Sequence, residues 1–151
     1  MKTVPWRLGG PHHYQPLATR PWATVADGDG FPDAPINRYL TFLAWQDWAP
    51  TTVRADARAL AAAATWLDFV GYGWAEATEA TWARYYGDTM VGRPRARDRA
   101  LRHVMTLHRA YAFWHWDNPR TIPFQPFPRR TRDRVAWLDH ALVTAITRRP
   151  R

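Results

Sequence analysis

Apolar residues recur at helical spacing over most of the chain beyond residue 33. The clearest case lies between Pro50 and Gly71, where apolar residues repeat at alternating intervals of four and three positions. This is the period of an amphipathic helix. The repeated positions are Val53, Ala57, Leu60, Ala64 and Leu67. The alanines at 61–64 leave room for another backbone, so we expect a long, closely packed helix that the glycines at 71 and 73 end.

Capping residues predict where the first two helices begin. Asp33 is a suitable N-cap with Pro35 in the first turn, and that helix must stop before Pro50. For the next helix, Thr51 or Thr52 is the expected cap. The inner side of the first helix is predicted to consist of Ile36, Leu40, Leu43 and either Asp47 or Trp48.

Three more helices are predicted in the rest of the chain. One begins at Thr78, with Glu79 in its first turn, where the helix dipole favours an acid. A longer one runs from about Ala96 to Trp116, and its apolar side consists of Ala100, Val104, Leu107, Tyr111 and Trp114. A final helix covers about residues 133–146, and its apolar side consists of Val135, Leu138, Leu142 and Ile146.

Residues 1–32 are rich in proline and glycine and cannot form a long helix. We expect an irregular arm there, with one short strand in the segment WATVAD at 22–27. The predicted class is therefore all-α, a compact bundle of four to five helices with a Pro/Gly-rich N-terminal arm. The expected parts are the arm at 1–32, a helical domain at 33–119, and a connector, final helix and basic tail at 120–151.

Charge is distributed very unevenly along the chain. Residues 1–92 carry 7 basic and 9 acidic side chains, for a net charge of −2. Residues 93–151 carry 14 arginines and 4 acids, for a net charge of +10. Such asymmetry favours a polyanionic partner, although a solvated basic surface is the simpler alternative.

A basic stripe runs along the predicted helix at 96–116. Arg95, Arg99, Arg102, Thr106 and Arg109 follow helical spacing, and Asp98 is the acid that neighbours them in the sequence. Arginines on one side of a helix can follow a phosphate backbone or enter a major groove. The alternative is a solvated face.

A second candidate site is the start of the helix after Pro50. Thr51, Thr52 and Arg54 place two hydroxyls and a cation at a helix N-terminus, which can bind phosphate, and Arg58 follows one turn later. For one of the two threonines, an ordinary N-cap is the favoured alternative.

Other chemistry finds little support. The chain has no cysteine, and its histidines, including His12 and His13, do not show zinc-ligand spacing. The segment DGDGFPD at 27–33 lacks the acid pattern of an EF-hand. Because no catalytic motif, signal peptide or apolar run of about 18 residues is found, we expect a non-enzymatic cytoplasmic protein without metal or cofactor.

Two segments resemble the N-terminal, SAM-like core-binding domain of tyrosine recombinases, the phage integrase family. They are NRYLTFLAWQDWAPTTVRADARALAAAATWLDFVGYGWAEAT and RARDRALRHVMTLHRAYAFWHWDNP. Within them, the family pattern corresponds to Thr51–Val53, Thr65–Leu67, Trp74–Thr78, Arg99–Tyr111 and Asn118–Pro119. The resembling region covers more than half of the chain, and its specificity comes from the order and spacing of these short matches.

The resemblance implies one half of a C-shaped clamp around double-stranded DNA at a recombination site. It implies DNA contacts by Thr51, Thr52, Arg54, Arg58, Arg95, Arg97, Arg99, Arg102 and His103, and the basic stripe adds Arg109. The family's catalytic domain would follow the linker, but no H-x-x-R motif is present, and the last tyrosine is Tyr111. We therefore expect no DNA cleavage by this chain.

The predicted function is thus sequence-directed binding of double-stranded DNA, with a catalytic domain or further protomers as additional partners and no membrane. Two alternatives remain. A helical interaction module could present its basic face to an acidic protein, or exposed tryptophans could stack on single-stranded nucleic acid or RNA.

Overall fold

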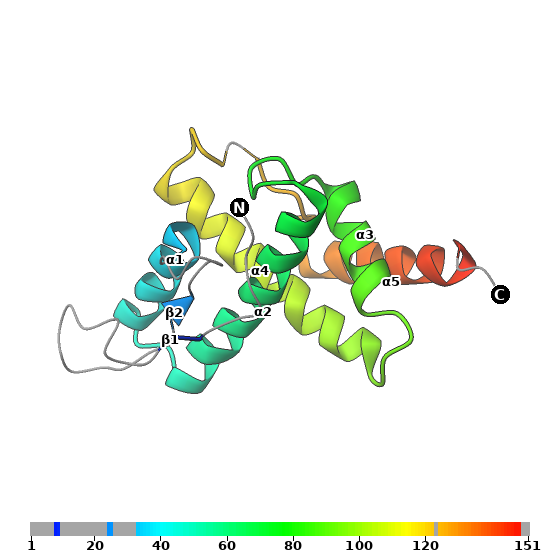
Figure 1. Cartoon of the computed structure of the whole chain (residues 1–151), viewed down its shortest axis with the longest axis horizontal. Coiled ribbons are helices and arrows are strands. Elements are labelled where there is room, and N and C mark those ends of the chain that lie inside the picture. The colour runs from blue at the N-terminus through cyan, green and yellow to red at the C-terminus, as the bar shows by residue number, and fades with distance from the viewer. Residues whose placement is uncertain (1–7, 10–23, 26–32, 123, 149–151) are drawn as a thin grey trace. The chain divides into compact units, whose positions relative to one another are not determined.

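A computed structural model describes residues 8–9, 24–25, 33–122 and 124–148, and these form five helices and a pair of two-residue strands (Figure 1). The all-α prediction is confirmed. The helices are α1 (Ala34–Trp45), α2 (Pro50–Val70), α3 (Glu79–Thr89), α4 (Ala96–Asp117) and α5 (Thr131–Arg148), and the strands are β1 (Leu8–Gly9) and β2 (Thr24–Val25). The chain forms two compact units, Met1–Gly73 and Trp74–Arg151. Within the described ranges, no helix is long and apolar enough to cross a membrane.

In the first unit, α1 begins as predicted and α2 does not. The Asp33 side chain caps α1 by accepting a hydrogen bond from the Ile36 N–H at 3.2 Å. The predicted threonine cap of α2 is wrong, because Ala49 is the N-cap residue and Pro50 is already helical. Proline suits the first helical position, since the N–H that it lacks would have no partner within the helix there.

The expected strand in the segment 22–27 is confirmed as β2, which pairs with β1 in antiparallel register, Leu8 with Val25. The side-chain amide of Asn37, in α1, bonds the backbone of Val25. Its Oδ1 accepts from the Val25 N–H and its Nδ2 donates to the Val25 carbonyl, both at 2.9 Å. Because Asn37 and Val25 are both buried, these bonds satisfy backbone groups that have no access to water. The remaining residues of the arm, with His12, His13 and most of DGDGFPD, lie outside the described residues.

The apolar side of α2 is confirmed, since Val53, Ala57, Leu60, Ala64 and Leu67 are all buried. Asp56 is buried too, and it accepts a hydrogen bond from the Tyr39 hydroxyl of α1 at 2.9 Å. The expected glycine cap is also confirmed, because Gly71 adopts the left-handed conformation at φ 83°. The end of α1 differs from the expectation: both Asp47 and Trp48 are exposed, because the chain turns at Asp47, whose φ is 61°.

In the second unit, aromatic rings join α3 to α4. Thr78 begins α3 with a capping box that it forms with Thr81. Trp82 of α3 is fully buried, and its ring lies 6.1 Å from the ring of Tyr111 in α4 and 5.9 Å from that of Trp74. The predicted apolar side of α4 is confirmed, since Ala100, Val104, Leu107, Tyr111 and Trp114 are buried.

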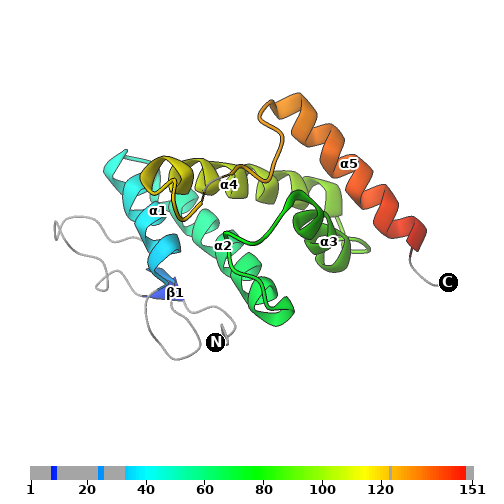
Figure 2. The same ribbon diagram turned by 90° about the horizontal axis from the view of Figure 1, so that it is seen from above.

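Helix α5 packs against α3 and α4 (Figure 2). Leu138 and Leu142 are buried as predicted, whereas Val135 is half-buried and Ile146 is 61% exposed. The last turns of α5 meet α3 through Ala145, which lies against Gly87. A Cβ added at Gly87 would lie only 2.7 Å from the Ala145 Cβ, so the two helices approach too closely for any side chain there.

We predict that Gly87→Ala lowers the free energy of unfolding by about 1–2 kcal/mol, because overpacking outweighs the roughly 1 kcal/mol by which alanine favours a helix over glycine. Urea denaturation followed by circular dichroism measures this change. Adding Ala145→Gly to that variant removes the clash and should recover part of the loss beyond additivity. A more stable Gly87→Ala protein would contradict the close approach.

Candidate nucleic-acid interface

Three arginines at the start of α4 form an exposed group, which we call the α4 arginines: Arg95, Arg99 and Arg102. Arg95 is the N-cap residue, with a left-handed backbone at φ 56°, and the other two follow at helical spacing. They lie on the side of α4 away from buried Ala100 and Val104. The structure records no ion pair between these three side chains and any described residue. Their charges are therefore available to a partner.

The basic stripe is shorter than the sequence predicts. Thr106 is only 5% exposed, and Arg109 is half-buried, with its Nη2 at 3.5 Å from the Thr106 hydroxyl. Phe113, one turn further along the same side, is buried as well. This side of α4 is thus accessible over its first two turns and covered beyond them. Arg109 contributes less to an exposed cationic surface than the α4 arginines do.

Arg97 points to α5 instead of lying with the α4 arginines. Its Nε donates to Asp139 Oδ1 at 2.8 Å and its Nη2 donates to Oδ2 at 3.2 Å. The bond and the charge of Asp139 raise the pKa of Arg97, and the guanidinium lowers the pKa of the Asp139 carboxyl. Sequence neighbours alone suggested that Asp98 was the only acid close to the arginines of this segment. The structure adds Asp139, 42 residues away, so the ion-pair partner of Arg97 is not visible in the local sequence.

His103 is held among tyrosines of α3. Its ring lies 5.5 Å from that of Tyr85 and 6.0 Å from that of Tyr86. Its Nδ1 is buried and has no hydrogen-bond partner in the part of the chain described. Burial lowers the pKa of His103 from 6.5 to about 4. The side chain is neutral at pH 7 and adds no positive charge to the surface.

The predicted residues of α2 belong to the first unit. Arg54 and Arg58 are exposed and one turn apart, and neither forms an ion pair with a described residue. Thr51 is exposed and Thr52 is half-buried. Because the Thr52 N–H donates to the Ala49 carbonyl at 2.9 Å, the start of α2 offers fewer free donors than expected.

Five further arginines between residues 93 and 147 are exposed: Arg93, Arg120, Arg129, Arg130 and Arg132. They lie in the loops before and after α4 and at the start of α5, and the sequence indicates them only through the net charge of residues 93–151. Arg134 is different, because it is 4% exposed and donates to the carbonyls of Pro128 and Arg129 at 3.0 and 2.6 Å. It holds the turn that precedes α5. Within the described ranges, no three His, Cys, Asp or Glu side chains gather as metal ligands.

We predict that the free energy of unfolding falls between pH 6.5 and 4 because of His103. Its folded pKa is about 4, below the unfolded value of 6.5, so the unfolded chain takes up a proton first as the pH drops. The loss reaches about 3 kcal/mol once the pH is below both values. Urea titrations at several pH values should show a shallower fall for His103→Phe. Parallel curves for the two proteins would place the titrating group elsewhere.

A search of family models, curated proteins and solved structures found no match to this chain. The resemblance to tyrosine recombinase core-binding domains stays a prediction that rests on the quoted sequence segments.

Proposed function

We propose that this protein binds double-stranded DNA, and that it does so as the core-binding domain of a tyrosine recombinase would, without cleaving the strands. The observation that carries the proposal is the group of α4 arginines, which are exposed and free of ion pairs among the described residues. Arginine suits phosphate and guanine because its planar guanidinium donates two parallel hydrogen bonds.

The spacing of the α4 arginines fits a polyphosphate backbone. From Arg95 to Arg102 a helix rises about 10 Å, and one DNA strand carries a charge every 3.4 Å along the axis, so the group spans about three phosphates. An α-helix also fits within the major groove. The first two turns of α4 thus combine the charge, length and exposure that a contact with duplex DNA requires.

Arg54 and Arg58 of α2 give the first unit a basic surface of its own. Asp56 lies between them in the sequence, but its side chain turns inward and accepts from Tyr39. The resemblance assigns DNA contacts to both helices, and each unit contributes one of them. Three of the residues predicted to contact DNA contribute less charge to this proposed contact. Arg97 is paired with an acid, His103 is neutral, and Arg109 is half-buried.

One observation favours single-stranded nucleic acid as a second candidate. Trp45, Trp48 and Trp116 are 60%, 41% and 71% exposed. Exposed aromatic rings can stack on bases of any sequence. Binding of a single strand in preference to the matched duplex would favour this function over the first.

We predict that Arg99→Ala with Arg102→Ala weakens duplex binding roughly ten- to hundredfold at physiological salt, because two phosphate contacts are lost. The slope of log affinity against log salt should become less steep by about two. Fluorescence anisotropy with a labelled random duplex measures both. The control is Arg38→Ala with Arg120→Ala, which removes two exposed charges outside α2 and α4. Equal effects of the two pairs would show that only net charge matters.

We predict that Arg54→Ala with Arg58→Ala also weakens duplex binding, with a separate decrease in salt slope of about two. In a variant that carries all four substitutions, the two losses in binding free energy should add, because the two pairs of arginines share no partner among the described residues. Unchanged affinity would limit the interface to the second unit.

A further inference from the structure

Three exposed arginines lie in the turn that leads into α5, and we call them the turn arginines: Arg129, Arg130 and Arg132. They are not among the residues proposed above to contact DNA, and none of them forms an ion pair with a described residue. Arg134 follows within α5 and is buried. Residues 129–134 therefore carry four arginines against one acid, Asp133, for a net charge of +3.

The buried guanidinium of Arg134 fixes the backbone that carries the turn arginines. Its Nη1 donates to the carbonyls of Pro128 and Arg129 at 3.0 and 2.6 Å, and its Nη2 donates to the Thr131 hydroxyl at 3.1 Å. The same Nη2 lies 3.7 Å from the sulfur of Met105, in the middle of α4. The turn is therefore held against α4, so that less conformational freedom remains to be lost when a partner binds to it.

The contact at Met105 places the turn next to the last of the α4 arginines. Met105 lies one helical turn from Arg102 and one turn from Arg109, and all of these residues belong to the second unit. His108 reports the positive charge in this region. Burial lowers the pKa of His108 below 6.5, and the charges of Arg134 and Arg109 lower it further. The turn thus extends the basic surface at the start of α4 sideways toward α5.

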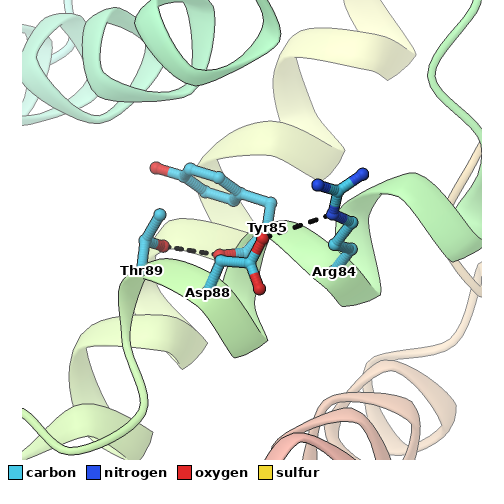
Figure 3. A network of polar contacts seen from close by, with 4 residues as sticks. All are labelled: Arg84, Tyr85, Asp88 and Thr89. Carbon is cyan, nitrogen blue, oxygen red and sulfur yellow. Dashed lines mark hydrogen bonds and ion pairs between the residues drawn. The ribbon is translucent and has the colours of Figure 1, made fainter. Parts of the chain in front are cut away.

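Two acids of the second unit form ion pairs with other arginines. Asp88 pairs with Arg84 on α3 at 3.3 Å (Figure 3), and Asp139 of α5 pairs with Arg97 at 2.8 Å. Asp133 is exposed, and its one carboxylate cannot balance the four arginines of residues 129–134. Positive charges gathered without counter-charges repel one another, and a polyanion that binds to them removes this repulsion.

A duplex that binds the α4 arginines comes within reach of the turn. Packed helices have axes about 8–10 Å apart, and the major groove of DNA is about 12 Å wide. When α4 lies in the groove, an element packed beside α4 therefore lies near a phosphate strand that borders the groove. Arginines in such an element contact phosphates, which are the same in every DNA sequence.

We infer that the turn arginines form a second phosphate-binding surface, which contacts the DNA backbone beside the groove that α4 enters. This inference rests on the proposed function and deepens it, because it adds sequence-independent contacts to those of the α4 arginines. Arg134 is a positioning residue in this arrangement: it touches the turn and α4, and it touches no DNA.

Substitution of two turn arginines tests the inference. Arg129→Ala with Arg132→Ala should weaken binding to a labelled random duplex roughly ten- to hundredfold at physiological salt. The slope of log affinity against log salt should become less steep by about two. The control that removes the same charge, Arg38→Ala with Arg120→Ala, should leave that slope nearly unchanged. Arg134 bonds the backbone carbonyl of Arg129, so the variant should fold, which circular dichroism verifies.

A second measurement locates the turn on the DNA. The chain has no cysteine, so Arg130→Cys provides a single attachment point for an iron–EDTA reagent that cleaves the DNA backbone close to it. The bound duplex should be cleaved from this position. The control is Val143→Cys, which is exposed and lies about 18 Å along α5 from the start of the helix, and it should give much less cleavage. Equal cleavage from the two positions, or none from Arg130→Cys, contradicts the inference.

The outcomes separate this inference from the function on which it rests. If the α4 substitutions weaken duplex binding and the turn substitutions only match the control, the inference is wrong and the proposed function stands. If the turn substitutions weaken binding and the α4 substitutions do not, the turn surface is supported and the α4 contact is wrong. A wild-type chain that does not bind the duplex at low salt overturns both.

Discussion

The second unit depends on the packing of aromatic rings around Trp82. This side chain is fully buried and contacts the rings of Trp74, Tyr85, Tyr111 and Phe127, which come from α3, α4 and the segments before and after them. Phe127 in turn contacts Trp137 of α5 at 5.4 Å. Edge-to-face and offset contacts of this kind are directional, so they determine the positions of three helices as well as their burial. The exposed first turns of α4 are therefore presented by a helix whose other end packs into this cluster.

The first unit is stabilised by buried hydrogen bonds in addition to its apolar core. The Asn37 side chain bonds both the N–H and the carbonyl of Val25, as a neighbouring strand would. Asp56 of α2 accepts a hydrogen bond from the Tyr39 hydroxyl of α1. Each of these groups is buried, and removing the Asn37 side chain would take from the buried Val25 N–H the acceptor that it has in the structure. This explains why two polar residues lie within otherwise apolar helix surfaces.

Local sequence predicted the helices well and the site less well. The apolar sides of α2 and α4, the Asp33 cap and the Gly71 cap all follow from residues a few positions apart, which helical spacing makes visible. The start of α2 was mispredicted because a proline at the first helical position and a threonine cap leave similar patterns. Ile146 was placed in the core because its spacing fits, but the Gly87–Ala145 approach turns the buried side of α5 elsewhere. The Arg97–Asp139 pair and the burial of Thr106 depend on residues far apart in the chain, so no local pattern could show them.

The contact between Gly87 and Ala145 also has a consequence for how this sequence can diverge. Gly87 cannot gain volume unless Ala145 gives it up, and Ala145 has only one methyl group to lose. Substitutions at the two sites are therefore coupled, and a related chain that carries alanine at the first position should carry glycine at the second. The two positions are 58 residues apart in the sequence and adjacent in space. Correlated substitutions at this pair could therefore identify distant relatives whose other residues no longer align.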